Sequence, residues 1–327
     1  MCGAPGVEHG VAALASLVAA VSVFACGTHD ASRQPSTTPD TLVIYLAASL
    51  TRPLQPLLDS FASREGVVLH RESGGSLEHA RKITELHRVP DVVLLADEEV
   101  FPQLLVPAHA TWYATFARNR MVVAFTPRSK GASEITADNW TRVLRRPDVE
   151  VGRTDPLLAP AGYRTLLMLE LAERYYRQPR LSAALLANAP ARNVRANAAD
   201  LAGLLAAGEL DYIYEYQSVA EANGFRFITL PPDIDLGDPT RAAHYSTATV
   251  RVQGPRAQPL TYTGRPIVYA LSVPIAARHS GAARRFLAFF LAAPTRAALR
   301  AAHVDMLDEP MITGTGAPPE LHVDSLR

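Results

Sequence analysis

The chain has 327 residues, of which 48% are hydrophobic and 20% charged, and its 32 basic residues equal its 32 acidic ones. This is ordinary globular composition with enough length for two domains or one large one, each with a sizeable core. A net charge of zero provides no basic field for nucleic acid, so we exclude nucleic acid as the expected partner.

The N-terminus is typical of an exported protein. Residues 11–25 are an apolar run of about the length of a signal-peptide core, too short to span a bilayer. The sequence Val23-Phe24-Ala25-Cys26-Gly27 then resembles a bacterial lipobox, in which Cys26 would be lipidated and become the first mature residue. One departure is that residues 1–10 contain no Lys or Arg. The alternatives are an ordinary secretory peptide with a coincidental cysteine, or a buried helix. We predict a lipoprotein-type signal peptide over residues 1–26.

Residues 27–40 are polar, contain proline and lack apolar periodicity, which predicts a flexible tether. Cys2 and Cys26 are the only cysteines in the sequence. The mature chain therefore has no intramolecular disulfide and no thiol-rich metal site.

From residue 41 the pattern alternates between strands and helices. Leu42 to Leu46 form a continuous apolar run, typical of a strand covered on both faces. The following apolar residues have the i, i+3, i+4, i+7 spacing of one helix face: Leu54, Leu57, Leu58, Phe61. We expect further strands at 67–69 and 91–96, a turn at 73–76 and a helix at 77–88. Repeated units of this kind predict a parallel α/β sheet.

The second part of the chain has the same α/β texture. The expected elements there are strands at 121–127, 211–214 and 266–273, and helices at 166–176, 199–207 and 283–299. The 121–127 strand ends in a proline, which suits a chain leaving one domain for another. We predict two α/β lobes joined by two crossing strands, with a ligand cleft between them. Lobe 1 is residues 41–125 plus 266–327, and lobe 2 is residues 126–265.

Four turns follow predicted strands or precede predicted helices. They are Ala47-Ala48-Ser49-Leu50, Ser73-Gly74-Gly75-Ser76, Pro160-Ala161-Gly162-Tyr163 and Tyr214-Glu215-Tyr216. Ligands of open α/β sheets bind at such turns, where serine hydroxyls and free helix amides donate to an anion. Each signal alone is weak, because a single Ser49 or Ser76 is more often a plain helix cap.

Several ordered segments together resemble one family. They include the serine turns above, Arg81-Lys82-Ile83-Thr84, Trp112-Tyr113, Phe116-Ala117-Arg118-Asn119, Gly162-Tyr163-Arg164, Gly208-Glu209-Leu210-Asp211-Tyr212 and Leu230-Pro231. From about residue 42 to 305 the chain resembles the periplasmic molybdate- and tungstate-binding proteins of ABC transporters, in particular their archaeal-type branch. The resemblance implies a type II periplasmic-binding-protein fold, an oxyanion held between closing lobes, and delivery to an ABC permease.

The resemblance also implies the ligand contacts. They are Ala48, Ser49, Ser76, Ala161, Gly162 and Glu215, and Asp155 is a further candidate because it lies four residues before the position of a family aspartate. Glu215 matches a carboxylate that bonds the molybdenum or tungsten itself, which removes the repulsion of about 4 kcal/mol between unit charges 4 Å apart at an effective dielectric of 20. Ala159 stands where the family has a second, aspartate ligand.

Three outcomes fit this change at Ala159. Asp155 swings in as the metal ligand, Glu215 holds the metal alone, or another anion is bound. Asp155 precedes a proline and also suits a plain turn residue, and a simpler role for Glu215 is a solvated charge at a strand end.

Enzyme signatures are absent from the sequence. There is no Gly-x-Ser-x-Gly elbow, His-Glu-x-x-His helix, Gly-x-Gly-x-x-Gly loop or Walker loop, and the ten histidines are scattered. We therefore expect a non-enzymatic, monomeric, lipid-anchored periplasmic protein without a cofactor. The alternatives are a binding protein for another oxyanion such as sulfate, and a hydrolase that uses Ser49 or Ser76.

Overall fold

The computed structural model describes residue 3 and residues 40–254 and 258–321. From Asp40 onward the described residues belong to one compact unit. The predicted signal peptide, Cys26 and nearly all of the tether lie outside the described residues. No helix in the described ranges is long and apolar enough to cross a membrane.

The first sheet contains seven strands, in the order β13-β4-β12-β3-β1-β2 with β14 also paired to β4. Its strands are β1 (Thr41–Ala47), β2 (Val68–Gly74), β3 (Val92–Leu95), β4 (Trp112–Asn119), β12 (Ile267–Ser272), β13 (Asp305–Met306) and β14 (Ile312–Gly314). β1 is parallel to β2 and β3, whereas β12 is antiparallel to both β3 and β4. The strand predicted to return late in the chain, β12, thus lies in the middle of this sheet.

Helices of the first sheet follow its strands directly. They are α1 (Thr51–Glu65), α2 (Ser76–Thr84), α9 (Ser280–Leu291) and α10 (Ala293–Ala301), with a short 3-10 turn, η1 (Ala48–Leu50), and a π-helical turn, η2 (Phe101–Leu105). α1 ends at Gly66, which has the left-handed φ of 64° that favours glycine. The apolar series of α1 faces the core, since Leu54, Leu58 and Phe61 are all buried.

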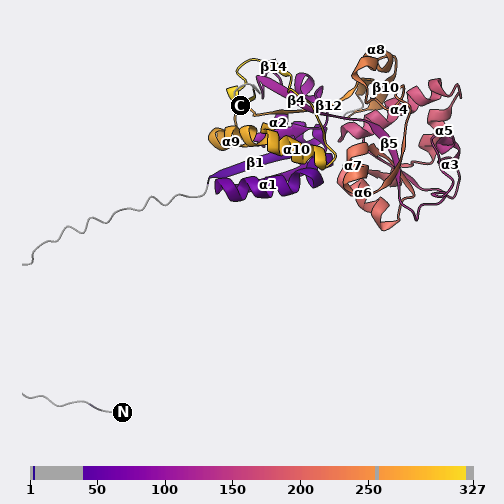
Figure 1. Cartoon of the computed structure of the whole chain (residues 1–327), viewed down its shortest axis with the longest axis horizontal. Helices are drawn as coiled ribbons and strands as arrows, with labels where there is room; N and C mark the ends of the chain where they lie inside the picture. Colours follow the sequence, from indigo (N-terminus) through magenta and orange to yellow (C-terminus); the bar gives the residue numbers. More distant parts are fainter. Residues whose placement is uncertain (1–2, 4–39, 255–257, 322–327) are drawn as a thin grey trace, which may run out of the picture. The chain divides into compact units, whose positions relative to one another are not determined.

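The second sheet has five strands in the order β7-β6-β8-β5-β9. They are β5 (Met121–Phe125), β6 (Val151–Thr154), β7 (Val194–Arg195), β8 (Tyr212–Tyr216) and β9 (Arg226–Thr229). Its helices are α3 (Trp140–Val143), α4 (Pro160–Tyr175), α5 (Leu181–Ala187), α6 (Ala198–Ala207) and α7 (Gln217–Ala222), with the 3-10 turn η3 (Ala191–Asn193). α4 and α7 lie beside β5, and α9 lies beside β1 (Figure 1).

Two further segments complete the described chain. An antiparallel hairpin of β10 (Thr249–Gln253) and β11 (Pro259–Thr263) follows the 3-10 turn η4 (Pro239–Arg241) and α8 (Ala242–Tyr245), and η6 (Pro319–Leu321) lies near the end. The chain passes between the sheets at Arg120, from β4 to β5, and returns to the first sheet through residues 264–266, from β11 to β12. The predicted α/β architecture with two crossing segments is confirmed. The lobe boundaries stay a prediction.

The prediction of a single helix over residues 283–299 is wrong. Residues 283–299 are two helices, because Ala292 takes an extended conformation (φ −58°, ψ 142°) between α9 and α10. Pro294 explains the break, since it lacks an amide donor and fits only the first turn of a new helix. α4 in turn begins six residues earlier than expected, at Pro160 and not Leu166. The Pro160-Ala161-Gly162 turn is therefore the helix's own first turn.

Candidate functional site

A small cavity lies where turns from the two sheets meet. Its lining comes from three turns of the first sheet (Ala47, Ala48, Ser49; Gly74, Gly75, Ser76; Ala96) and from three places around the second (Ala159, Pro160, Ala161; Asn197, Ala198; Tyr216). Its volume is about 20 Å³, which is room for one water molecule. A tetrahedral oxyanion is larger than this space.

Three helices begin at the cavity. α2 starts at Ser76, α4 at Pro160 and α6 at Ala198, and each start brings amide donors without an intrahelical acceptor. None of the described residues that line the cavity carries a charge. An anion here would be held by helix dipoles, amides and hydroxyls without a cationic side chain at the wall.

Ser76 lies at the first position of α2 and is fully buried. Its Oγ accepts a hydrogen bond from the Ala96 amide at 2.9 Å. Because this bond uses the oxygen as acceptor, the hydroxyl hydrogen remains for a further acceptor at the cavity. Ser49 lies in η1, with its Oγ 2.9 Å from the Tyr269 hydroxyl. Both predicted serines and Ala48 thus line one wall.

His79 connects two of the segments that form this wall. Its Nε2 lies 3.0 Å from the Leu46 carbonyl, and its ring stacks on Tyr45 with centroids 4.9 Å apart. Burial lowers the pKa of His79 to about 4, so the ring is neutral at ordinary pH and donates from Nε2. One side chain therefore links the end of β1, which η1 and Ser49 directly follow, to α2, which carries Ser76.

The turns of the two sheets are in direct contact beside the cavity. The amides of Leu77 and Glu78 donate to the Leu158 carbonyl at 3.2 and 3.3 Å. Gly75 permits this approach, because a Cβ at this position would overlap the Leu158 carbonyl oxygen. Two amide donors in the first turn of α2 are thus already bonded to a carbonyl of the turn that precedes α4.

Ala161 and Gly162 have different places in the first turn of α4. Ala161 lines the cavity, whereas Gly162 lies behind it and donates its amide to the Ala159 carbonyl at 3.0 Å. A Cβ on Gly162 would overlap the backbone of Asp155 and Pro156. Gly162 therefore allows the turn to pack tightly, and the anion-donor role predicted for its amide would require that bond to Ala159 to change.

Asp155 organises its own turn and does not line the cavity. Its Oδ1 accepts from the Leu157 amide at 2.8 Å, and its carbonyl accepts from the amides of Leu158 and Ala159. This is the hydrogen bonding of an Asx turn. Ala159, which stands at the predicted aspartate position, is the cap residue of α4 and lines the cavity with a methyl group.

Glu215 is fully buried near the end of β8. Its Oε1 accepts from the Tyr216 amide at 2.9 Å, and its Oε2 has no hydrogen-bond partner among the described residues. Burial raises the pKa of this carboxyl from 4.5 to about 8. Glu215 itself does not line the cavity, but Tyr216 does. The unpartnered Oε2 thus belongs to the residue next to Tyr216, which lines the cavity.

A buried ion pair that sequence reasoning missed joins the two sheets nearby. Arg164 of α4 contacts Asp97, after β3, at 2.9 Å, with both side chains at most 3% exposed. The Tyr163 hydroxyl also donates to Asp97, and Arg164 donates to the Arg265 carbonyl at 2.9 Å. Arg164 appeared in the family-like segment, but its partner, 67 residues earlier, had no signal in the sequence.

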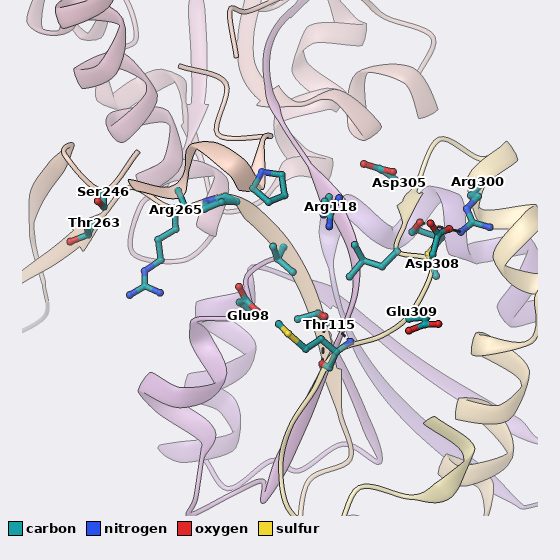
Figure 2. Close-up of a pocket in the computed structure, with 17 residues that line it drawn as sticks. Glu98, Thr115, Arg118, Ser246, Thr263, Arg265, Arg300, Asp305, Asp308 and Glu309 are labelled. Carbon is teal, nitrogen blue, oxygen red and sulfur yellow. Dashed lines mark hydrogen bonds and ion pairs between the residues drawn. The ribbon is translucent and has the colours of Figure 1, made fainter. Parts of the chain in front are cut away.

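A much larger cavity lies elsewhere, with a volume of about 850 Å³. Figure 2 shows Ser246 and Thr263 at the left of it, Arg118, Glu98 and Thr115 in the middle, and Arg300 and Asp308 at the right. Arg300 pairs with Asp308 at 3.0 Å. None of the predicted ligand residues lines it. Metal-ligating clusters of three or more His, Cys, Asp or Glu are also absent from the described part of the chain.

The fold is that of the type II periplasmic binding proteins. The sulfate-binding protein SubI of Mycobacterium tuberculosis superposes with a TM-score of 0.58 at 16% identity, covering 87% of this chain and 90% of that one. The periplasmic molybdate-binding protein of Azotobacter vinelandii also gives 0.58, at 17% identity, over 80% and 98% of the two chains. At these identities the likeness concerns the fold alone.

Sequence comparison identifies the family. Residues 42–304 match the model of the bacterial extracellular solute-binding proteins, and the chain belongs to that family. The molybdate/tungstate-binding protein of Thermococcus kodakarensis is 33% identical over 341 residues, 95% of each chain. That of Pyrococcus abyssi is 34% identical over 307 residues, 86% of this chain and 88% of its own. An uncharacterized solute-binding protein of Petrotoga mobilis is 40% identical over 258 residues, 78% and 80% of the two chains.

Proposed function

We propose that this protein captures molybdate or tungstate outside the cytoplasm and delivers it to an ABC permease, without catalysing a reaction. The observation that carries the proposal is the uncharged cavity at which three helices begin and to which Ser49 and Ser76 contribute hydroxyls. Relatives that bear the name molybdate/tungstate-binding protein at 33 and 34% identity support the choice of ligand.

Capture would work by a shift of population. An oxyanion that bridges the serine turns of the first sheet and the α4 and β8 residues of the second stabilises the closed arrangement. The proposed contacts are Ala48, Ser49, Ser76, Ala161, Gly162 and Glu215. Glu215 would direct its unpartnered Oε2 to the metal of the oxyanion. Asp155 would join only if its turn rearranged, because its carboxylate is engaged with Leu157.

The rest of the proposal concerns export and assembly. The family's description as extracellular is consistent with a periplasmic location. We further propose that residues 1–26 are a signal peptide, that Cys26 carries a lipid anchor, and that the mature protein is a monomer without a cofactor. Mass spectrometry of the mature N-terminus tests the anchor, since a lipidated Cys26 would be its first residue.

Sulfate is the second candidate ligand. Glu215 does not line the cavity in the present arrangement, and the donors at the wall fit any tetrahedral oxyanion. A hydrolase is disfavoured because the serine hydroxyls contact Tyr269 and the Ala96 amide, and neither is hydrogen-bonded to a histidine within the described residues.

Titration calorimetry of the whole mature chain with molybdate, tungstate, sulfate and phosphate tests the proposal. We expect molybdate and tungstate to bind more tightly than sulfate. Glu215→Gln should weaken tungstate at least tenfold, as expected for a lost contact to a charged group. Equal affinities for sulfate and tungstate would contradict metal coordination by Glu215, and no binding of any of the four anions would contradict the function.

A further inference from the structure

A buried hydrogen-bond network lies behind Ser49. The Ser49 Oγ and the Tyr269 hydroxyl are 2.9 Å apart, and the Asn119 Nδ2 lies 3.0 Å from the same hydroxyl. Asn119, the last residue of β4, precedes the passage to the second sheet at Arg120. Tyr269, in β12, follows the return passage at residues 264–266. All three side chains are buried, at 8% exposure or less.

The orientation of the Asn119 amide is fixed by backbone donors. Its Oδ1 accepts from the amide of Arg120 at 2.9 Å and from that of Ser218 at 3.4 Å. A backbone N–H donates and does not accept, so this side of the amide must be the oxygen. The Nδ2 group therefore donates to both of its partners, the Tyr269 hydroxyl and the Ser218 Oγ, the latter at 2.7 Å.

The direction of the next bond follows. The Tyr269 oxygen accepts from Asn119, and the Ser49 Oγ, 2.9 Å away, is an acceptor within reach of the Tyr269 hydroxyl hydrogen. With Tyr269 as the donor of this bond, the Ser49 hydroxyl hydrogen is left for the cavity that Ser49 lines. The Ser76 Oγ likewise accepts a hydrogen bond, from the Ala96 amide, so its hydroxyl hydrogen also remains for the cavity. Both serines at the wall become donors.

We propose that Tyr269 and Asn119 are positioning residues that fix Ser49 as a hydrogen-bond donor to the bound oxyanion. The consequence is selectivity, because a fully deprotonated oxyanion offers acceptors alone, whereas hydrogen phosphate presents a hydroxyl that finds no acceptor at Ser49. An unpaired polar group discriminates strongly when it is buried. This inference rests on the proposed oxyanion-binding function and specifies which protonation state of ligand the same site takes.

The same asparagine reaches the second sheet. Ser218 belongs to α7, which directly follows β8 and its Glu215, and Asn119 both donates to its hydroxyl and accepts from its amide. Asn119 therefore holds the Ser49 donor and the Glu215 segment from one point. The orientation of the Ser49 hydroxyl on one side of the cavity is therefore connected, through Asn119, to the position of the end of β8 on the other side.

Tyr269→Phe tests the inference, with tungstate and inorganic phosphate as probes at pH 8. The substitution removes the donor to Ser49, whose hydroxyl can then accept. We expect the affinity for tungstate to fall about tenfold, the effect of one hydrogen bond, and phosphate affinity to fall less or to rise. The ratio of the phosphate Kd to the tungstate Kd therefore decreases relative to wild type. A purely structural role would weaken both ligands equally and leave the ratio unchanged, which would overturn the proposal.

Two control experiments test whether the effect of Tyr269→Phe acts through Ser49. Tyr212→Phe removes another buried tyrosine hydroxyl, which donates to the Lys130 carbonyl at 2.7 Å in the second sheet, and should leave the ratio unchanged. In a Ser49→Ala background, Tyr269→Phe should change the ratio no further, since the two residues act as one unit. A changed ratio in Tyr212→Phe, or additive effects of Ser49 and Tyr269, would contradict the inference. Failure of the wild type to bind either anion would instead contradict the proposed function.

Discussion

Glu215 has the most distinctive environment of the predicted residues. It is fully buried, one carboxylate oxygen has no described partner, and burial raises its pKa to about 8. The protein without ligand therefore keeps this carboxyl protonated at neutral pH. A ligand that bonds the Oε2 atom must displace the proton, so capture and proton release would be linked.

This environment predicts how stability depends on pH. The folded pKa is above the unfolded value of 4.5, so the unfolded chain loses this proton first. Its contribution to stability is complete below about pH 4.5 and is lost as pH rises to about 8, at up to about 1.4 kcal/mol per pH unit. Urea unfolding of ligand-free protein between pH 5 and 9 should show a fall that Glu215→Gln reduces. Glu85→Gln, at an exposed side chain, is the control, and an identical pH profile in Glu215→Gln would contradict the prediction.

Asp155 provides a second prediction about a single residue. Its Oδ1 serves the Leu157 amide, and an asparagine would keep that acceptor while removing the charge. Asp155→Asn should therefore leave the tungstate Kd within about threefold of wild type, less than the effect of one hydrogen bond to a charged group. Titration calorimetry decides it. A loss as large as that of Glu215→Gln would show that Asp155 takes the place of the missing family aspartate.

The sequence predicted part of this residue-level picture. Ser49, Ser76 and Ala161 were expected from turns after strands or before a helix, and they line one cavity. Tyr269, Asn119 and Asp97 were not expected in any role, because their partners are 66 to 220 residues away in the sequence. Such pairs depend on tertiary register, which local periodicity does not carry.

Among the elements, those with strong local patterns were predicted well. The β1 apolar run and the α1 apolar face both appear in the structure, because burial on a sheet or helix face imposes a period that a sequence displays. The strands β4, β6, β7 and β9, the short strands β13 and β14 and the β10–β11 hairpin were missed. β13 has two residues and β14 three, too few to show alternation, and they are strands through pairing with β4.

The start of α2 yields the next prediction. Gly75→Ala adds a methyl group where the Leu158 carbonyl already lies, so the first turn of α2 must move away from the turn before α4. We expect the amides of Leu77 and Glu78 to lose this acceptor, stability to fall by about 1–3 kcal/mol, and tungstate binding to weaken. Thermal unfolding and calorimetry measure the two effects.

Gly203→Ala is the matched control for Gly75→Ala. Gly203 lies inside α6, and a Cβ there would meet nothing within 4 Å. Alanine in a helix interior is favoured over glycine, so this variant should gain roughly 0.5–1 kcal/mol and bind normally. Normal stability and normal tungstate binding in Gly75→Ala would mean that the contact between the two turns is unimportant.

For the whole molecule, the passages between the sheets separate two cavities. In β4, Arg118 lines the large cavity while Asn119 contacts Tyr269, and in β12, Val268 lines the large cavity while Tyr269 contacts Ser49. Successive residues of a strand point to opposite faces. The large cavity and the small predicted ligand site therefore lie on opposite faces of the same two strands. We expect a rotation about these strands that widens one cavity to narrow the other.

This arrangement predicts that filling the large cavity strengthens ligand capture. Ala242 lines that cavity from α8 and is exposed, so Ala242→Trp adds bulk there without disturbing the core. The tryptophan would oppose narrowing of the large cavity, and hence opening of the small one, which favours the closed state to which the oxyanion is proposed to bind. We expect tungstate to bind several-fold more tightly, mainly through slower release in stopped-flow measurements, and small-angle scattering of the ligand-free protein to report a more compact population. Gln178→Trp places the same residue on an exposed position outside both cavities and should change neither quantity. Weaker tungstate binding in Ala242→Trp would mean that the two cavities do not move against each other.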